Sequence, residues 1–163
     1  MKQENLLENT ENMTTEEVLE NEGNLLSNLL ELAKRKEDEA YFRKIEIKGE
    51  KGEVKATFRL RPMSSEDVEK CSKQATRFVK QPSGKPEKEM NVRQFQSILI
   101  YEATVPEDQK NFWGNIELKR ALNVLDNFDM VDKLLLAGEK ASVIEIINEM
   151  GGFSEEVVET AKN

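Results

Sequence analysis

Apolar side chains recur at helical spacing near the start of the chain. Within Asn24–Lys36 they fill two neighbouring stripes of a helix: Leu25, Leu29 and Leu32, then Leu26, Leu30 and Ala33. A capping-box pattern, Thr14 followed by Glu17, starts a helical stretch earlier, and Gly23 is predicted to interrupt it. The pattern therefore predicts an amphipathic, leucine-rich helix with a wide apolar face.

The spacing changes to every second residue after Phe42. Ile45 and Ile47 alternate with charged residues, and a glycine-containing turn follows at 49–52. The next apolar residues alternate with polar ones: Val54, Ala56, Phe58 and Leu60. Such alternation is typical of strands with one buried and one solvated face. We therefore expect an antiparallel β-hairpin over residues 42–61 that packs against helices.

Two longer helices are predicted next. Ser64 or Ser65 caps the first, whose apolar stripe is Val68, Cys71, Ala75, Phe78 and Val79. Residues 81–89 contain two prolines and a glycine and are predicted to form a flexible loop. The second helix starts at Asn91, ends before Pro106, and presents Val92, Phe95, Ile98, Leu99 and Ala103. The helix residues expected to be buried are Val68, Cys71, Ala75, Phe78, Phe95 and Leu99.

The last third of the chain indicates shorter helices, at Glu117–Leu122 and Asn127–Ala137. Gly138 is predicted to form a left-handed elbow, because only glycine adopts that conformation without steric cost. A helix from Glu139 then places four apolar residues on one face: Val143, Ile146, Ile147 and Met150. Gly151 and Gly152 end it, and Phe153 is expected to fold back on its last turn. The fold class is therefore α+β: a small antiparallel β-hairpin packed with a mainly helical domain.

Charge divides the chain into two parts. Of the net charge of −8, residues 1–40 account for −7, with 11 acidic and 4 basic residues. We therefore predict an acidic arm with a leucine-rich helix over 1–40 and a single α+β domain over 41–163. Residues 1–13 are expected to be disordered, because they hold too little apolar surface to offset the ordering entropy.

Composition excludes most chemistry. The chain has no histidine, which removes the commonest general base and metal ligand. Its one cysteine, Cys71, lies on an apolar stripe and fits a buried thiol in a reducing cytoplasm. No apolar run is long enough to span a membrane, and no secretion signal is present. Asp126, Asp129 and Asp132 lack the spacing of a calcium-binding loop. Two of them have a simpler explanation: Asp126 is expected to cap a helix, and Asp129 to lie in its first turn. We expect a non-enzymatic protein without cofactor or metal.

Three features remain as candidate binding surfaces. The stripe of Leu25, Leu29 and Leu32 can dock on its own domain, pair with another subunit or hold a partner helix. The adjacent Phe112 and Trp113 are either core anchors, which we favour, or a binding hot spot. Four basic residues of the first long helix form a cationic face: Lys70, Lys73, Arg77 and Lys80. Because no aromatic residues lie between them, we favour a solvated face over a nucleic-acid-binding site.

Three blocks of sequence carry a family resemblance. The first is Phe58-Arg59-Leu60-Arg61-Pro62-Met63, which leads into Ser64-Ser65-Glu66-Asp67. The second runs from Ile98 to Pro106. The third runs from Leu134 to Phe153 and contains Leu-Leu-x-x-Gly-Glu and Gly-Phe signatures. In order and spacing they resemble the XkdN-like tail assembly chaperones of long-tailed phages and prophages. The acidic arm up to Ala40 is longer than the resemblance leads us to expect.

The resemblance implies an ATP-independent assembly factor of the bacterial host cytoplasm. Such a chaperone binds the tape-measure protein, a long apolar helical ruler, and keeps it soluble while the tail tube assembles. The tail tube protein and a second copy of the chain are further candidate partners. Two alternatives stay open: a nucleic-acid-binding regulator that uses the Lys70–Lys80 face, and a structural component of the tail.

Overall fold

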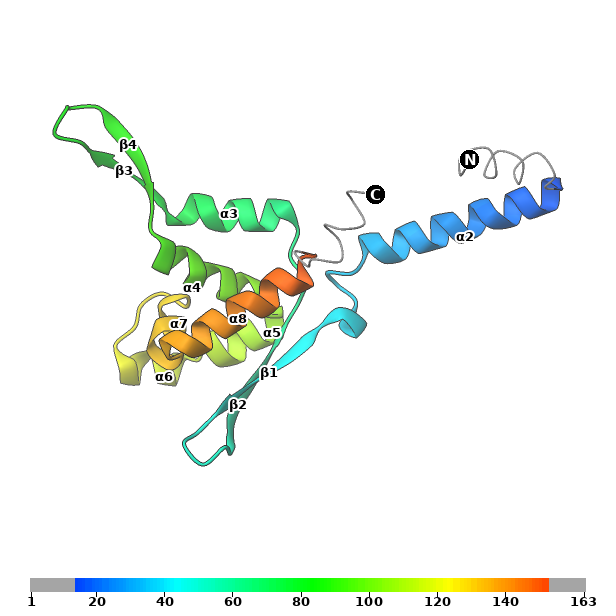
Figure 1. Cartoon of the computed structure of the whole chain (residues 1–163). Coiled ribbons are helices and arrows are strands. Elements are labelled where there is room, and N and C mark those ends of the chain that lie inside the picture. The colour runs from blue at the N-terminus through cyan, green and yellow to red at the C-terminus, as the bar shows by residue number, and fades with distance from the viewer. Residues whose placement is uncertain (1–13, 153–163) are drawn as a thin grey trace. The chain divides into compact units, whose positions relative to one another are not determined.

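The computed structural model describes residues 14–152 (Figure 1). The predicted disorder of residues 1–13 and the predicted contact of Phe153 lie outside these residues. The chain divides into two compact units, Met1–Arg35 and Lys36–Asn163.

The described part of the first unit is a single helix, α2 (Thr15–Ala33). Its capping box is the predicted one: Thr14 Oγ1 accepts from Glu17 N, and Glu17 Oε2 accepts from Thr14 N. The predicted interruption at Gly23 is wrong, because one glycine costs only about 1 kcal/mol in a helix and the leucines continue the pattern. No residue of α2 is buried.

The second unit begins with the short 3₁₀ turn η1 (Glu39–Tyr41) and the predicted hairpin, β1 (Arg43–Lys48) and β2 (Val54–Leu60). The strands are antiparallel, with Ile45 opposite Phe58. Phe58 and Leu60 are buried as expected, whereas Val54 is exposed because it lies past an irregularity in the register, near the turn. Two backbone hydrogen bonds, from Arg61 N to Ala103 O and from Val105 N to Arg59 O, fix β2 to the end of the helix that finishes at Ala103.

The helix α3 (Ser65–Ala75) starts at Ser64, whose hydroxyl accepts from Asp67 N. Burial opposes ionisation of Asp67, but hydrogen bonds from Lys36 and Ser64 outweigh it and lower the pKa of Asp67 to about 2. Cys71 and Ala75 are buried, as predicted, and Val68 is partly buried against the core.

A second hairpin replaces the predicted end of this helix. The strands β3 (Thr76–Lys80) and β4 (Pro86–Met90) pair with each other and extend past the ends of the helices they join (Figure 1). Two predictions are therefore wrong: Phe78 is 70% exposed, not core, and residues 86–89 form a strand, not a loop. The β-branched and aromatic residues of 76–79 favour extended backbone, and Gly84 (φ 79°) closes the turn.

The helical body surrounds α4 (Val92–Ala103), which packs against α3, α7 and α8. The remaining elements are α5 (Pro106–Asp108), the π-helical turn η2 (Gln109–Trp113), α6 (Ile116–Leu122), α7 (Asp129–Leu134) and α8 (Ala137–Met150). The predicted start at Asn91 is confirmed, and the Asn91 side chain caps α4. Leu99 is buried, and Phe95 is partly buried against the core. The α+β prediction is confirmed.

The predicted left-handed elbow at Gly138 is wrong. Gly138 lies in the first turn of α8, and among the described residues positive φ occurs only at Gly52, Gly84, Asn123 and Gly152. Extended backbone at Leu135 and Leu136 makes the turn instead, and the Glu139 carboxylate accepts from Leu136 N at 2.8 Å. Gly152 (φ 84°) follows the last turn of α8, so the predicted glycine stop is confirmed.

Replacing Gly138 with alanine is expected to raise the free energy of unfolding by about 0.5 kcal/mol, since alanine restricts the unfolded chain and favours helix. No atom lies within 4 Å of the position that its Cβ would take. Thermal unfolding of the purified variant measures the change. A loss of stability would show that this turn is strained after all.

Candidate partner-binding surfaces

The described residues contain no cluster suited to metal or nucleophilic chemistry. No group of three histidine, cysteine, aspartate or glutamate side chains is placed to hold a metal ion there. The predicted cap at Asp126 is wrong, because Phe128 precedes α7 and no side chain caps it. Burial raises the pKa of the Cys71 thiol to about 11, with Glu102 and Asp67 adding to the effect, so this thiol stays protonated at neutral pH.

Trp113 is a core residue, the alternative that the sequence favoured. It is fully buried, and its Nε1 donates to Thr104 Oγ1 at 2.9 Å. Its ring meets Phe58 edge-on at 5.1 Å between centroids and Phe112 at 4.5 Å. Trp113 therefore has no accessible surface for a partner, and Phe112 is partly buried beside it.

The basic face predicted on one helix is split between two elements. Lys70 and Lys73 lie on α3, where each forms an ion pair with the glutamate four residues before it. Arg77 and Lys80 lie on β3. The continuous helical cationic stripe that the nucleic-acid alternative requires is therefore absent from the described part of the chain.

The leucine stripes of α2 are exposed. Five leucines each expose between 49% and 59% of their surface: Leu25, Leu26, Leu29, Leu30 and Leu32. α2 is the only described helix of its unit, so no neighbour within that unit covers them. Because an isolated amphipathic helix owes most of its stability to packing of its apolar face, α2 is a candidate binding surface.

A second apolar surface is a groove of about 290 Å³ in the helical body. Its lining residues come mainly from α4 and α8, with Val68 from α3 and Met90 from β4, and Figure 1 shows these elements. We call it the α4 groove; its lining is Met63, Val68, Met90, Val92, Phe95, Gln96, Leu99, Ile144, Ile147, Asn148 and Gly151. The sequence predicted several of these residues as core, but it did not show that the helices leave a channel between them.

The β3–β4 hairpin continues this surface. Thr76, Phe78 and Lys80 share one face of the hairpin with their direct partners Met90, Lys88 and Pro86. Met90 also lines the α4 groove, so this face is joined to it. Lys88 Nζ lies 5.7 Å from the centroid of the Phe78 ring. The alternation Thr76-Phe78-Lys80 was the sequence signal that could have revealed the strand.

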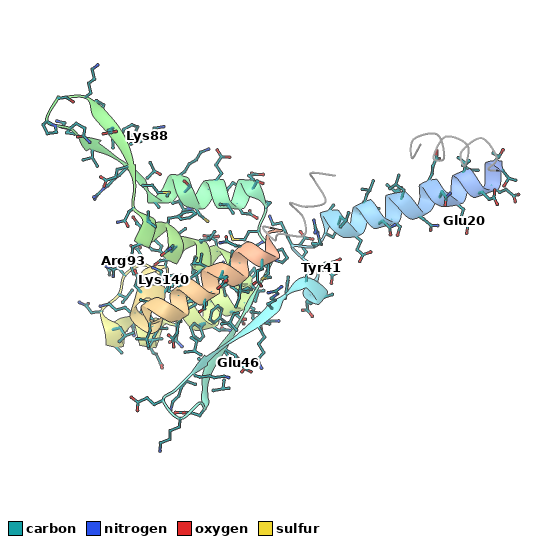
Figure 2. The ribbon with its side chains drawn as sticks, viewed as in Figure 1. Glu20, Tyr41, Glu46, Lys88, Arg93 and Lys140 are labelled. Atoms are coloured by element: carbon teal, nitrogen blue, oxygen red, sulfur yellow. The ribbon has the colours of Figure 1, made fainter. Side chains whose placement is uncertain are left out.

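Sequence reasoning also missed a buried cation. Lys140 on α8 is buried, and its Nζ donates to Asp132 Oδ1 at 2.7 Å, Ser97 Oγ at 2.8 Å and Arg93 O at 3.0 Å. Arg93 Nε also donates to Asp132 Oδ2, and Figure 2 labels Arg93 and Lys140 close together. Burial alone would raise the pKa of Asp132, but the bond to Lys140 and the charges of both cations hold it below its ordinary value. The cluster joins α4, α7 and α8 and is structural.

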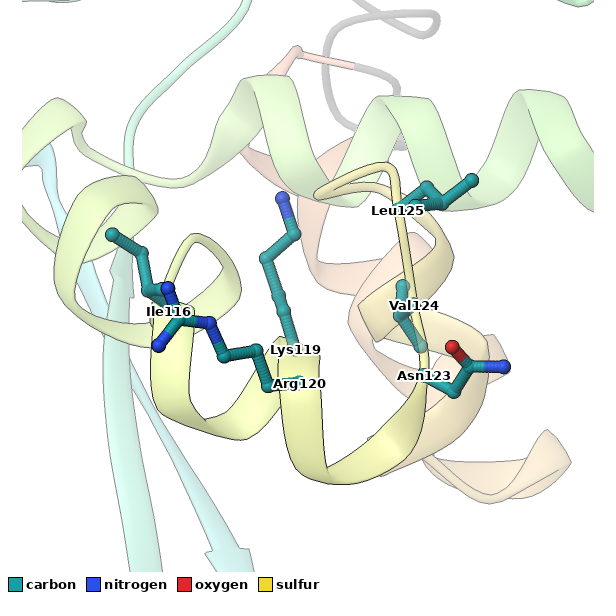
Figure 3. A pocket seen from close by; sticks show the side chains of 6 residues that line it. All are labelled: Ile116, Lys119, Arg120, Asn123, Val124 and Leu125. Atoms are coloured by element: carbon teal, nitrogen blue, oxygen red, sulfur yellow. The ribbon is translucent and has the colours of Figure 1, made fainter.

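A further cavity of about 300 Å³ lies beside α6 (Figure 3). Lys119 extends from this helix, and its Nζ donates to Asn127 Oδ1 at 2.7 Å. Leu125 and Ile116 line it and are largely exposed. This shallow site brings together no set of groups that points to a ligand.

The described residues therefore present two apolar surfaces, the leucine face of α2 and the α4 groove. No described helix has the length and apolar character needed to cross a membrane. Residues 26–162 match the family of phage XkdN-like tail assembly chaperone proteins, and the chain belongs to this family.

Other comparisons add little. No curated protein matches the chain. The crystal structure of the protein YqbN is similar with a TM-score of 0.44 and 18% identity, over 69% of this chain and 87% of that one.

Proposed function

We propose that this chaperone binds the tape-measure protein of its phage tail and keeps it soluble until the tail tube assembles around it. The observation that carries the proposal is the exposed leucine face of α2 on a chain that belongs to the tail assembly chaperone family. A long helical client presents apolar stripes, and a helix with matching stripes can cover them by helix-to-helix packing.

The charge of α2 suits a holding function. Thr15–Ala33 contains five glutamates and no basic residue, so a client covered by this helix gains a negatively charged outer surface. Like-charged complexes repel one another, which opposes aggregation. Because the leucine face offers apolar contacts, a growing tube can displace the chaperone by competing for the same client surface.

Replacing Leu25 and Leu29 together with serine is expected to abolish most of the solubilising effect. The test is co-expression with the tape-measure protein of the same phage and measurement of the soluble client fraction. Because both leucines are exposed, the domain from Lys36 onward should keep its melting temperature.

The matched control is Asn24→Ser with Asn28→Ser. It has the same spacing and the same introduced residue on the polar side of α2, and it should leave the soluble fraction unchanged. Normal solubilisation by the leucine variant would remove α2 as the client surface. Recovery of the chain from purified phage particles would favour a structural tail component instead.

A further inference from the structure

The α4 groove is an open apolar cavity that is solvent-exposed at its hairpin end. Leu99 and Ile147 form its buried floor and wall, while Met90 and Val92 at the hairpin end are 40% and 57% exposed. An apolar channel between helices is the shape in which an amphipathic helix docks.

The hairpin gives the groove a polarity. Lys80 and Lys88 share the hairpin face that runs on from Met90, and neither forms an ion pair with another described residue. At the other end the lining is Met63 and Gly151, without a charged side chain. A helix that fits both parts must be apolar along one face and acidic at the end that reaches the hairpin.

α2 has this chemistry. Four of its five glutamates lie in the first eight residues, Thr15–Glu22, and its leucines from Leu25 to Leu32 follow. At 1.5 Å per residue its 19 residues span about 28 Å, longer than the roughly 18 Å of the 12-residue α4. α2 is therefore long enough to place leucines in the groove while its glutamates reach the hairpin.

We propose that α2 of one copy of this chain binds in the α4 groove of a second copy, with its acidic first half on Lys80 and Lys88. The exchange is reciprocal, so two helices fill two grooves and the assembly closes as a symmetric dimer. The proposal does not depend on the identity of the client. It uses the leucine face assigned above to the client, so dimer formation and client binding compete.

The experiment is sedimentation velocity of the full chain over a range of concentrations. The wild-type chain should form a dimer that dissociates on dilution. Because the contact is partly ionic, high salt should weaken the dimer, so that it dissociates at a higher protein concentration. Lys80→Glu with Lys88→Glu should weaken the dimer by about 10-fold or more, since it replaces attraction to the α2 glutamates by repulsion. Val92→Asp should weaken it as well, while an acidic residue in the first turn of α4 preserves the helix.

The control is Arg77→Glu with Lys85→Glu, which changes the net charge equally but acts on the opposite hairpin face and in the turn. It should leave the dimer intact. A mixing test then identifies exchange of α2 between copies. It uses two variants, a leucine variant (Leu25→Ser with Leu29→Ser) and a groove variant (Lys80→Glu with Lys88→Glu and Val92→Asp). Each variant should be monomeric alone, and together they should form a one-to-one complex. The first supplies the intact groove and the second the intact helix.

Three outcomes overturn the proposal. A dimer that persists in the groove variants places the interface elsewhere. Leucine and groove variants that fail to pair on mixing exclude exchange of α2 into the groove. A wild-type chain that is monomeric at every concentration excludes binding of α2 to a second copy. This holds even if hydrogen exchange shows that the amides of α2 are protected. Each of these results leaves the client proposal standing, because solubilisation is measured separately.

Discussion

Replacing Trp113 with alanine is expected to lower the free energy of unfolding by about 3–5 kcal/mol, the largest effect of any single substitution proposed for this chain. Trp113 has no exposed surface and joins η2 to the β1–β2 hairpin through its edge-on contact with Phe58. The substitution leaves a cavity where three aromatic rings meet. Urea unfolding followed by circular dichroism measures the loss.

Trp113→Phe separates packing from the hydrogen bond. It keeps most of the ring contact, and Thr104 Oγ1 keeps its bond to Ile100 O, so the cost should be only about 1–2 kcal/mol. Equal losses in both variants would mean that the hydrogen bond to Thr104, not the ring packing, dominates.

Replacing Lys140 with methionine is expected to cost about 3 kcal/mol. The substitution removes three hydrogen bonds of a buried ammonium group and leaves the Asp132 carboxylate with Arg93 as its ionic partner. Lys133→Met on the neighbouring helix is the control. Lys133 is exposed, so its replacement should change the stability by less than about 0.5 kcal/mol.

The pH dependence of the Lys140 variant gives a second readout. The pKa of Asp132 is lowered in the folded state, so its contribution to stability is full above the ordinary value of 3.8 and is lost as the pH falls through the folded value. Without Lys140 that pKa should rise, because burial remains while the main hydrogen bond is gone. The stability difference between wild type and variant should therefore be largest near neutral pH and shrink in acid. A constant difference would show that Lys140 acts by packing alone.

The candidate surfaces were predicted unevenly. The leucines of α2 could be found from the sequence because their stripes are repeated within one helix and need no other part of the chain. The α4 groove could not, because apolar stripes on three helices do not reveal whether the helices pack closely or leave a channel. Phe112 and Trp113 looked like either anchor or hot spot until the rings of Phe58 and Trp113 were seen in contact.

Periodicity and capping residues were sufficient to predict the α+β class, the β1–β2 hairpin, the starts of α2, α3 and α4, and the glycine stop of α8. Each depends on periodicity or capping within a few residues, where local physical chemistry suffices. The change from helix to strand at Thr76 depends on long-range pairing, because the helical stripe that included Phe78 competed with pairing to a strand ten residues away. The burial of Lys140 against Asp132 and the helical place of Gly138 likewise follow from tertiary packing. Those outcomes depend on which distant groups meet, and a cation on a helix becomes a core residue only when a carboxylate from another helix compensates its charge.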